Sequence, residues 1–168
     1  MADVQTASLY ERDFYLWSLD QAKAFRRLRD AAAGQGDLPS ALDAIDWDNA
    51  IEELEGLAKR DRRELQSRIN VIVEHLTKLE TSLDDLPRAE WESTVRRERS
   101  DIELLLQQSP SLRREVAHFI ASPSAMKTRR QTIEALAKRE AIGAGDRGSF
   151  TGSQILEDWW PDLPDLNP

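Results

Sequence analysis

The chain has no cysteine among its 168 residues, which excludes disulfide bonds, thiolate metal sites and cysteine nucleophiles. Glycine and proline number seven each, and they gather in a few short segments that we interpret as joints between helices. The sequence also lacks a run of about 18 consecutive apolar residues, which a membrane-spanning helix needs. Its first residues, Met-Ala-Asp-Val-Gln, have neither the basic start nor the apolar core of a secretion signal. We therefore expect a cytoplasmic protein that makes no contact with a membrane.

Positive charge is in deficit, because 23 Lys and Arg face 31 Asp and Glu, for a net charge of −8. An acidic surface repels nucleic acid, so this composition disfavours a nucleic-acid partner. A regulator that contacts nucleic acid through its basic groups is the weakest alternative; these groups are Arg60, Arg62, Arg63 and Arg68, then Arg96, Arg97 and Arg99, then Lys127, Arg129, Arg130, Lys138 and Arg139. Pairs four residues apart, such as Glu64 with Arg68, favour ordinary solvated helix faces.

Helical periodicity is the clearest positive signal. Branched aliphatic residues recur at steps of three and four along one stripe, formed by Leu65, Ile69, Ile72, Leu76, Leu79 and Leu83. At least one partner helix must cover such a stripe. An earlier helix is expected to begin near Tyr10 and to end at Gly34, with an inner face formed by Tyr10, Phe14, Trp17, Ala24, Leu28 and Ala31.

Helix starts can be recognised elsewhere in the chain. Asp46 is placed to cap a short helix that begins at Trp47, and the pattern leaves open whether this helix continues into the one that holds Leu65. Ser109-Pro110 and Ser122-Pro123 each match an N-cap followed by proline in the first turn, and Ser153 is placed to cap a last short helix. The expected inner positions are Trp91, Val95, Glu98, Ile102 and Leu105, then Leu112, Val116, Phe119 and Ile120, then Met126, Ile133, Leu136 and Ala137, then Ile155, Leu156 and Trp159.

Together these patterns predict an all-α, single-domain helical bundle of about six to seven helices, with antiparallel neighbours and no sheet. We expect an extended or disordered segment at 1–8, the bundle at 9–142, a flexible linker at 143–152, and a short helix with a tail at 153–168.

Several short motifs occur in a characteristic order. They are Tyr10-x-x-Asp13-Phe14-x-x-Trp17, Ile45-Asp46-Trp47 with Ile51-Glu52-Glu53-Leu54, His75-Leu76-x-Lys78, Trp91-x-x-Thr94-Val95, and Ser109-Pro110-Ser111-Leu112. In these motifs the chain resembles a bacterial family catalogued as domain of unknown function twenty-nine. The resemblance covers residues 9 to 112 and fades from Arg113 onward. It implies an all-helical bacterial protein, and it brings no activity, cofactor or catalytic residue with it.

Polar residues at the edges of the apolar stripes are candidates for a site. His75 could act as a general base, although no serine, cysteine or second histidine is visibly paired with it, so we interpret it as a hydrogen-bonded residue at the edge of the core. Glu98 lies within an apolar stripe and needs a donor, for which His75 or Arg68 is available. A small enzyme or a metal- or ligand-binding bundle would use Glu53, His75, Glu98 and Arg68.

Metal ligation has a weak signal. Glu115-x-x-His118 has the spacing of carboxylate-bridged di-metal bundles, but the second copy that such a site needs is absent from the sequence. Glu52 and Glu53 are explained by the positive end of a helix. We therefore expect no metal and no cofactor.

Trp159-Trp160-Pro161 is unusual near a chain end, because two exposed indole rings would be adhesive. Docking of Trp159 on the chain's own core is the favoured interpretation. The leading functional hypothesis is a non-enzymatic module that binds another protein or a second copy of itself through apolar helix faces and Trp159 and Trp160.

Overall fold

The computed structural model describes residues 8–34, 42, 44–142 and 148–162. Seven α-helices and one 3-10 turn account for its regular structure in these residues, and they contain no strand. The helices are α1 (Leu9–Arg12), α2 (Phe14–Ala33), α4 (Trp47–Thr81), α5 (Arg88–Gln108), α6 (Glu115–Ile120), α7 (Pro123–Glu140) and α8 (Gly152–Leu156), with the 3-10 turn η1 (Pro110–Arg114) before α6. The all-α prediction is confirmed. Parts of the segments expected at 1–8, 143–152 and 153–168 lie outside the described residues, namely 1–7, 143–147 and 163–168.

The chain divides into two compact units: residues 1–63 with 106–112, and residues 64–105 with 113–168. α4 is one helix of 35 residues, so the two helices expected between Trp47 and Leu83 are continuous. Its residues up to Arg63 belong to the first unit, and those from Glu64 onward belong to the second.

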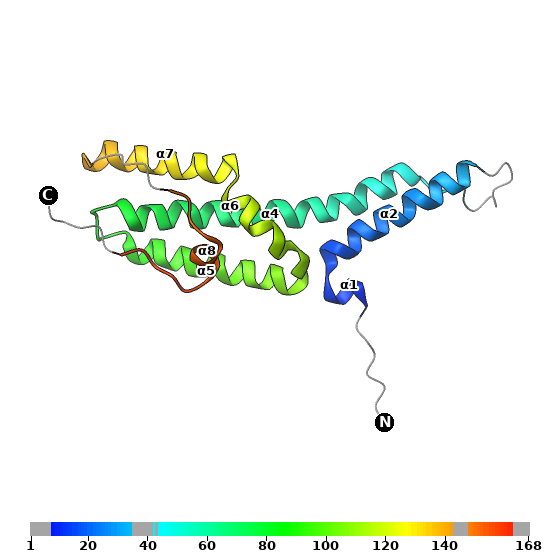
Figure 1. Ribbon diagram of the computed structural model, residues 1–168, viewed down its shortest axis with the longest axis horizontal. Coiled ribbons are helices and arrows are strands. Elements are labelled where there is room, and N and C mark those ends of the chain that lie inside the picture. Colours follow the sequence, from blue (N-terminus) through cyan, green and yellow to red (C-terminus); the bar gives the residue numbers. More distant parts are fainter. Residues whose placement is uncertain (1–7, 35–41, 43, 143–147, 163–168) are drawn as a thin grey trace, which may run out of the picture. The chain divides into compact units, whose positions relative to one another are not determined.

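In the first unit, α2 lies antiparallel to the N-terminal part of α4 (Figure 1). Arg26 pairs with Glu55, and Arg29 pairs with Asp48 at 2.7 Å, so that numbers fall along α4 as they rise along α2. The Phe25 and Trp47 rings meet edge to face at 6.0 Å. Asp46 caps α4 as expected, since its carboxylate accepts from the Asn49 N–H at 3.2 Å.

The helix expected from Tyr10 to Gly34 is interrupted at Asp13, which ends α1 and caps α2 by accepting from the Leu16 N–H at 2.9 Å. The expected inner face is also wrong. α2 buries a neighbouring row of small residues, Ser18, Ala22 and Ala32, instead of the predicted stripe. The larger apolar residues of the predicted stripe are therefore exposed or only half-buried.

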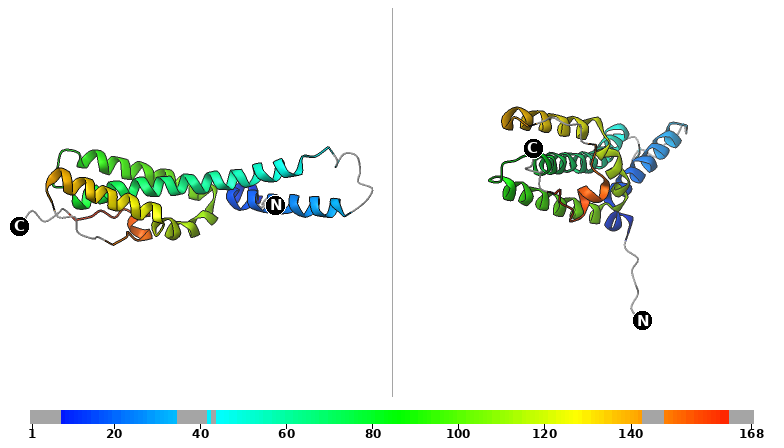
Figure 2. Two further views of the ribbon diagram at one scale, coloured as in Figure 1. Left: turned by 90° about the horizontal axis from the view of Figure 1, so that it is seen from above. Right: turned by 60° about the vertical axis from the view of Figure 1, so that its left-hand side comes forward.

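In the second unit, α5 and α7 run along the C-terminal part of α4 (Figures 1 and 2). The predicted stripe forms its core, because Leu65, Ile69, Ile72, Leu76 and Leu79 are all 1% exposed or less. Leu83 is exposed, contrary to the prediction, because α4 ends at Thr81. Met126 is likewise exposed, whereas Ala125, Ile133 and Leu136 form the buried row of α7.

The start of α7 follows its sequence signal, since Ser122 accepts from the Ala125 N–H at 3.3 Å and Pro123 occupies the first position. The last helix differs. Thr151 and not Ser153 is the N-cap of α8, in a reciprocal capping box with Gln154, and Trp159 lies beyond the helix. Phe150, in the segment expected to be a linker, is buried.

Candidate functional site

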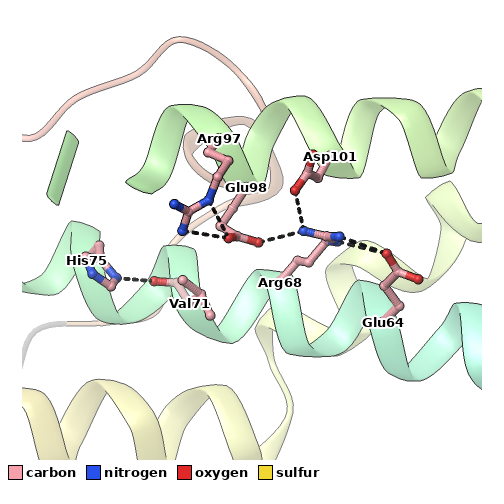
Figure 3. Close-up of polar contacts among 7 residues, drawn as sticks. All are labelled: Glu64, Arg68, Val71, His75, Arg97, Glu98 and Asp101. Carbon is pink, nitrogen blue, oxygen red and sulfur yellow. Dashed lines mark hydrogen bonds and ion pairs between the residues drawn. The ribbon is translucent and has the colours of Figure 1, made fainter. Parts of the chain in front are cut away.

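Arg68 and Glu98, two of the four residues proposed to form a polar site, are in direct contact in the second unit (Figure 3). Arg68 Nη1 donates to Glu98 Oε2 at 2.9 Å and to Asp101 Oδ2 at 2.6 Å. Its Nε and Nη2 donate to Glu64 Oε1, one helical turn earlier, at 3.1 and 2.9 Å. Arg97 donates to the other oxygen of Glu98 at 3.3 Å. Burial alone would lower the pKa of Arg68, but the hydrogen bonds to Glu64 and Glu98 and the charge of Asp101 raise it.

The cluster is an ion-pair network, because Arg68 stays charged and donates to three carboxylates at once. Glu98 is buried, as the sequence pattern required, and Arg68 neutralises it. The arrangement connects α4 to α5.

His75 and Glu53 lie apart from this network. The His75 ring nitrogen Nδ1 pairs with the Val71 carbonyl of its own helix at 2.9 Å, and Figure 3 shows the ring to one side of Arg68 and Glu98, with no contact drawn to either. Glu53 is exposed and belongs to the first unit. The structure therefore brings together two of the four proposed site residues, Arg68 and Glu98.

Among the described residues there is no group of three or more His, Asp or Glu side chains arranged to hold a metal ion. His118 is exposed, and its ring lies against Phe119 at 5.7 Å. Glu52 is exposed in the first turns of α4. Within the same residues, no helix is both long and apolar enough to cross a bilayer.

Within the second unit, Arg99 on α5 holds the segment that contains α8 and Trp159. The Arg99 guanidinium donates to the carbonyl oxygens of Gln154 at 2.8 Å, Ile155 at 3.0 Å and Trp159 at 2.8 Å. These carbonyls belong to the end of α8 and the turn beyond it, which would otherwise lack donors. Burial lowers the pKa of Arg99, and Asp158 partly opposes that effect. A single arginine thus holds the end of the last helix, where the sequence predicted apolar contacts by Ile155, Leu156 and Trp159.

Both tail tryptophans make contacts within the second unit. The Trp159 ring lies 6.0 Å from the ring of buried Phe150. The Trp160 ring lies 4.8 Å from the guanidinium carbons of both Arg96 and Arg99. Each tryptophan is half-buried.

One of the basic residues, Arg129, is buried in the second unit. Arg129 is 7% exposed, and its guanidinium lies 4.1 Å from the Phe150 ring centroid. It donates to Thr77 Oγ1 at 3.0 Å and to Glu80 at 2.8 Å. Its burial carried a sequence signal, because Ala125, Arg129, Ile133 and Leu136 form one row at steps of four and three. Arg68, Arg97, Arg99 and Arg129 are thus engaged in internal contacts.

A second polar network, which sequence analysis missed, lies in the first unit. Asp13 accepts from the Ser111 N–H at 2.7 Å and from the Ser111 hydroxyl at 2.9 Å. Ser109 accepts from the Tyr15 N–H at 3.1 Å and donates to Asp61 at 3.1 Å. Asp13 therefore accepts hydrogen bonds at the starts of both α2 and η1. Ser109 was expected to cap the turn that begins at Pro110, but its side chain instead accepts from the backbone of α2.

One apolar surface of the first unit is only partly covered by the described residues. We define the open face as Tyr10, Phe14, Trp17, Ala24, Leu28 and Ala31, the stripe that sequence analysis placed inside. Tyr10 is 54% and Leu28 is 47% exposed, Ala24 and Ala31 are exposed, and Phe14 and Trp17 are half-buried. The three rings contact one another, with Tyr10 edge-on to Phe14 at 5.5 Å and to Trp17 at 4.9 Å.

α4 adds a second row, Ala50, Leu54 and Leu57, and from here on the open face includes these three residues. Ala50, Leu54 and Leu57 are half-buried and are rotated from the buried row of Ile51 and Ala58. On α2, the residues of the open face are rotated in the same sense from the buried row of Ser18 and Ala22. In an antiparallel pair, equal rotation places both rows on one side of the two helices. The first unit thus carries an apolar surface two helices wide.

Comparison with known proteins places the chain in a family. The sequence pattern of the family described as "Domain of unknown function DUF29" matches residues 9–160. The chain belongs to the DUF29 family. This match continues through α8, beyond the point at Arg113 where the motif resemblance fades. No significant match is found among curated proteins.

A crystal structure described as an alpha-helical protein of unknown function, from Rhodospirillum rubrum, has the same fold. Its TM-score is 0.64 at 20% identity, over 91% of this chain and 92% of that chain. At this level of identity the likeness concerns the fold alone.

Two of the five DUF29 motifs quoted from the sequence meet in space within the first unit. Asp13 comes from the motif Tyr10-x-x-Asp13-Phe14-x-x-Trp17, and Ser109 and Ser111 come from Ser109-Pro110-Ser111-Leu112. Their polar residues form the capping network, and the aromatic residues of the first motif are part of the open face. The first motif therefore combines a structural role for Asp13 with a place on the open face for exposed Tyr10 and half-buried Phe14 and Trp17.

Proposed function

We propose that this DUF29 chain is a non-enzymatic protein-interaction module and that the open face is its docking surface. The supporting observation is the difference between its two units. The second unit buries large side chains from α4, α5, α6, α7 and α8, as an independently stable core does. Among the described residues of the first unit, the buried apolar side chains are fewer and smaller: Ile51, Leu106, Leu112 and three alanines, Ala22, Ala32 and Ala58.

Large apolar residues gain stability when they leave water, at about 25 cal/mol for each Å² buried. Contiguous apolar patches on a protein surface are typical of interaction sites, and aromatic residues dominate the binding energy of interfaces. The open face combines both properties, since Tyr10, Phe14 and Trp17 form one ring cluster next to Leu28. In this proposal Trp159 and Trp160 hold the tail on the second unit, and the open face takes the docking role.

Photo-crosslinking in the cell that encodes the protein tests this function. A photoreactive phenylalanine analogue replaces Leu28, and the matched control places it at Leu104, which is also exposed, at 54%, but lies on α5 of the second unit. We expect a discrete covalent adduct with a protein at position 28 and none at position 104. Equal labelling at both positions, or no adduct at either, would contradict the proposed docking surface.

A further inference from the structure

We infer that the partner that covers the open face is a second copy of this chain. This inference rests on the proposed function and adds the identity of the partner. Its basis is the pattern of charges that borders the apolar residues on both helices.

The open face has the dimensions of a protein interface. α2 has 20 residues, and a helix of that length spans about 30 Å with a diameter of about 10 Å. Two such helices side by side present roughly 600 Å² in flat projection, which is of the order of the ~800 Å² per partner that a standard interface buries. A second hairpin of the same kind, laid on this surface, would complete a four-helix arrangement.

On α2, an acid and a base lie along the border of the open face. Trp17, Asp20, Ala24, Arg27 and Ala31 follow one another at steps of three and four, so all lie along one side of the helix. Arg27 is exposed and forms no hydrogen bond or ion pair with any residue in the described part of the chain. Asp20 forms a solvent-exposed pair with Lys23 at 3.2 Å, which contributes little to stability.

α4 repeats this pattern on the other border. Ala50, Glu53, Leu57 and Arg60 follow at steps of three and four, and Glu53 and Arg60 are both exposed. Each border therefore carries an acid followed, seven residues later, by a base. A two-fold axis places each border either against the same border of the second copy, running in the opposite direction, or against its other border. In either case an acid of one copy meets a base of the other. The surface is complementary to itself in charge as well as in hydrophobicity.

Two symmetric pairings satisfy this pattern, and exchange of charges distinguishes them. If α2 lies on α2 of the second copy, Asp20 faces Arg27. If α2 lies on α4 of the second copy, Arg27 faces Glu53. In both pairings the Arg27→Glu substitution replaces two attractive contacts by two repulsive ones, at a position that is exposed in the single chain.

Sedimentation equilibrium of the full-length protein at micromolar concentration is the experiment. We expect the unmodified chain to be dimeric and Arg27→Glu to raise the dimer dissociation constant about tenfold or more. Arg113→Glu, an identical change at an exposed position of η1, is the matched control and leaves the dimer unchanged. Mixing the Arg27→Glu chain with an Asp20→Arg chain restores association if α2 meets α2, and mixing it with Glu53→Arg restores association if α2 meets α4.

Three results would overturn the second copy as partner: a monomeric unmodified chain, a dimer that Arg27→Glu leaves intact, or a failure of both mixtures to associate. Crosslinking at Leu28 separates this outcome from failure of the proposed function. An adduct with a different protein keeps the docking surface and removes the second copy, whereas the absence of any adduct removes both.

Discussion

The Asp13 carboxylate accepts hydrogen bonds from both the backbone N–H and the hydroxyl of Ser111, a residue 98 positions further along the chain. Asp13 also accepts from the Leu16 N–H, so one buried side chain satisfies donors at the starts of two segments. Removal of such a cap exposes N–H groups that have no alternative partner. Asp13 thereby fixes the start of α2, on which the open face is built.

Asp13→Ala should accordingly destabilise the first unit. Loss of one cap costs about 0.5 to 2 kcal/mol, and because two segments lose an acceptor we expect about 2 to 3 kcal/mol in the free energy of unfolding, measured with urea. Asp13→Asn retains an acceptor oxygen for one of the two starts and should lose about half as much. Equal stability of the Asp13→Ala variant and the unmodified protein would show that water replaces the carboxylate.

Leu76→Ala tests the core of the second unit. Leu76 is fully buried, so its truncation removes apolar contacts and leaves a cavity, which costs about 2 to 5 kcal/mol. Leu86→Ala is the matched control, because Leu86 is 94% exposed and its truncation should change the unfolding free energy by less than about 0.5 kcal/mol. A loss at Leu76 as small as that at Leu86 would show that α4 is not packed as described.

The sequence predicts the apolar side of each helix better than it predicts what covers that side. Leu65 to Leu79 were identified as core because their spacing is regular over four turns. The stripe from Tyr10 to Ala31 has similar periodicity, yet α4 packs on the adjacent row of small residues, where helix backbones can approach closely. Periodicity does not distinguish a face buried within the chain from a face that awaits a partner.

Long-range polar pairs have the weakest local signal. Glu98 lies on an apolar row and therefore needed a donor, for which His75 and Arg68 were the two candidates. Arg68 is the donor in the structure. Neither Asp13 nor Ser111 was identified as a cap from the sequence, and nothing in the residues between them indicates that Asp13 accepts from the segment of Ser111. Arg99 has no local signal either, since its three acceptors are backbone carbonyls, which have no residue identity.

Arg99→Met should release the C-terminal segment while the rest of the second unit stays folded. Hydrogen bonds to a charged group contribute about 1.5 to 3 kcal/mol, so we expect amide protection in residues 154–160 to fall about tenfold or more. Hydrogen exchange measures this directly, with the amides of α4 as an internal reference. Arg130→Met, at an exposed position of α7, is the control. Unchanged protection at residues 154–160 in the Arg99 variant would assign the docking to Ile155 and Trp159 alone.

Glu140 should make stability depend on acid pH. Burial alone would raise the pKa of Glu140, but hydrogen bonds from Arg139, the Ser82 hydroxyl and the Leu83 N–H lower it below the ordinary value of 4.5. A carboxyl whose pKa is lower in the folded than in the unfolded state binds more protons when unfolded. Its contribution is therefore complete above the ordinary pKa and is lost as the pH falls through the folded-state pKa.

Urea unfolding of the Glu140→Gln variant at several pH values measures this contribution. We expect the difference in unfolding free energy from the unmodified protein to be largest above pH 4.5 and to shrink at more acidic pH. Glu134→Gln is the control, because Glu134 is exposed and pairs with Arg130 only at 3.8 Å. A difference that grows as the pH falls would contradict the role of the Glu140 carboxylate between the ends of α7 and α4.

The absence of cysteine allows the central claim to be tested with a single introduced thiol. The measurement is the rate of thiol labelling of purified Leu28→Cys protein over a range of protein concentrations, with Leu104→Cys as the reference. If a second copy covers the open face, labelling at position 28 slows as the concentration rises, and labelling at position 104 does not. Rates that are independent of concentration at both positions would show that the open face stays in contact with water and would contradict the account.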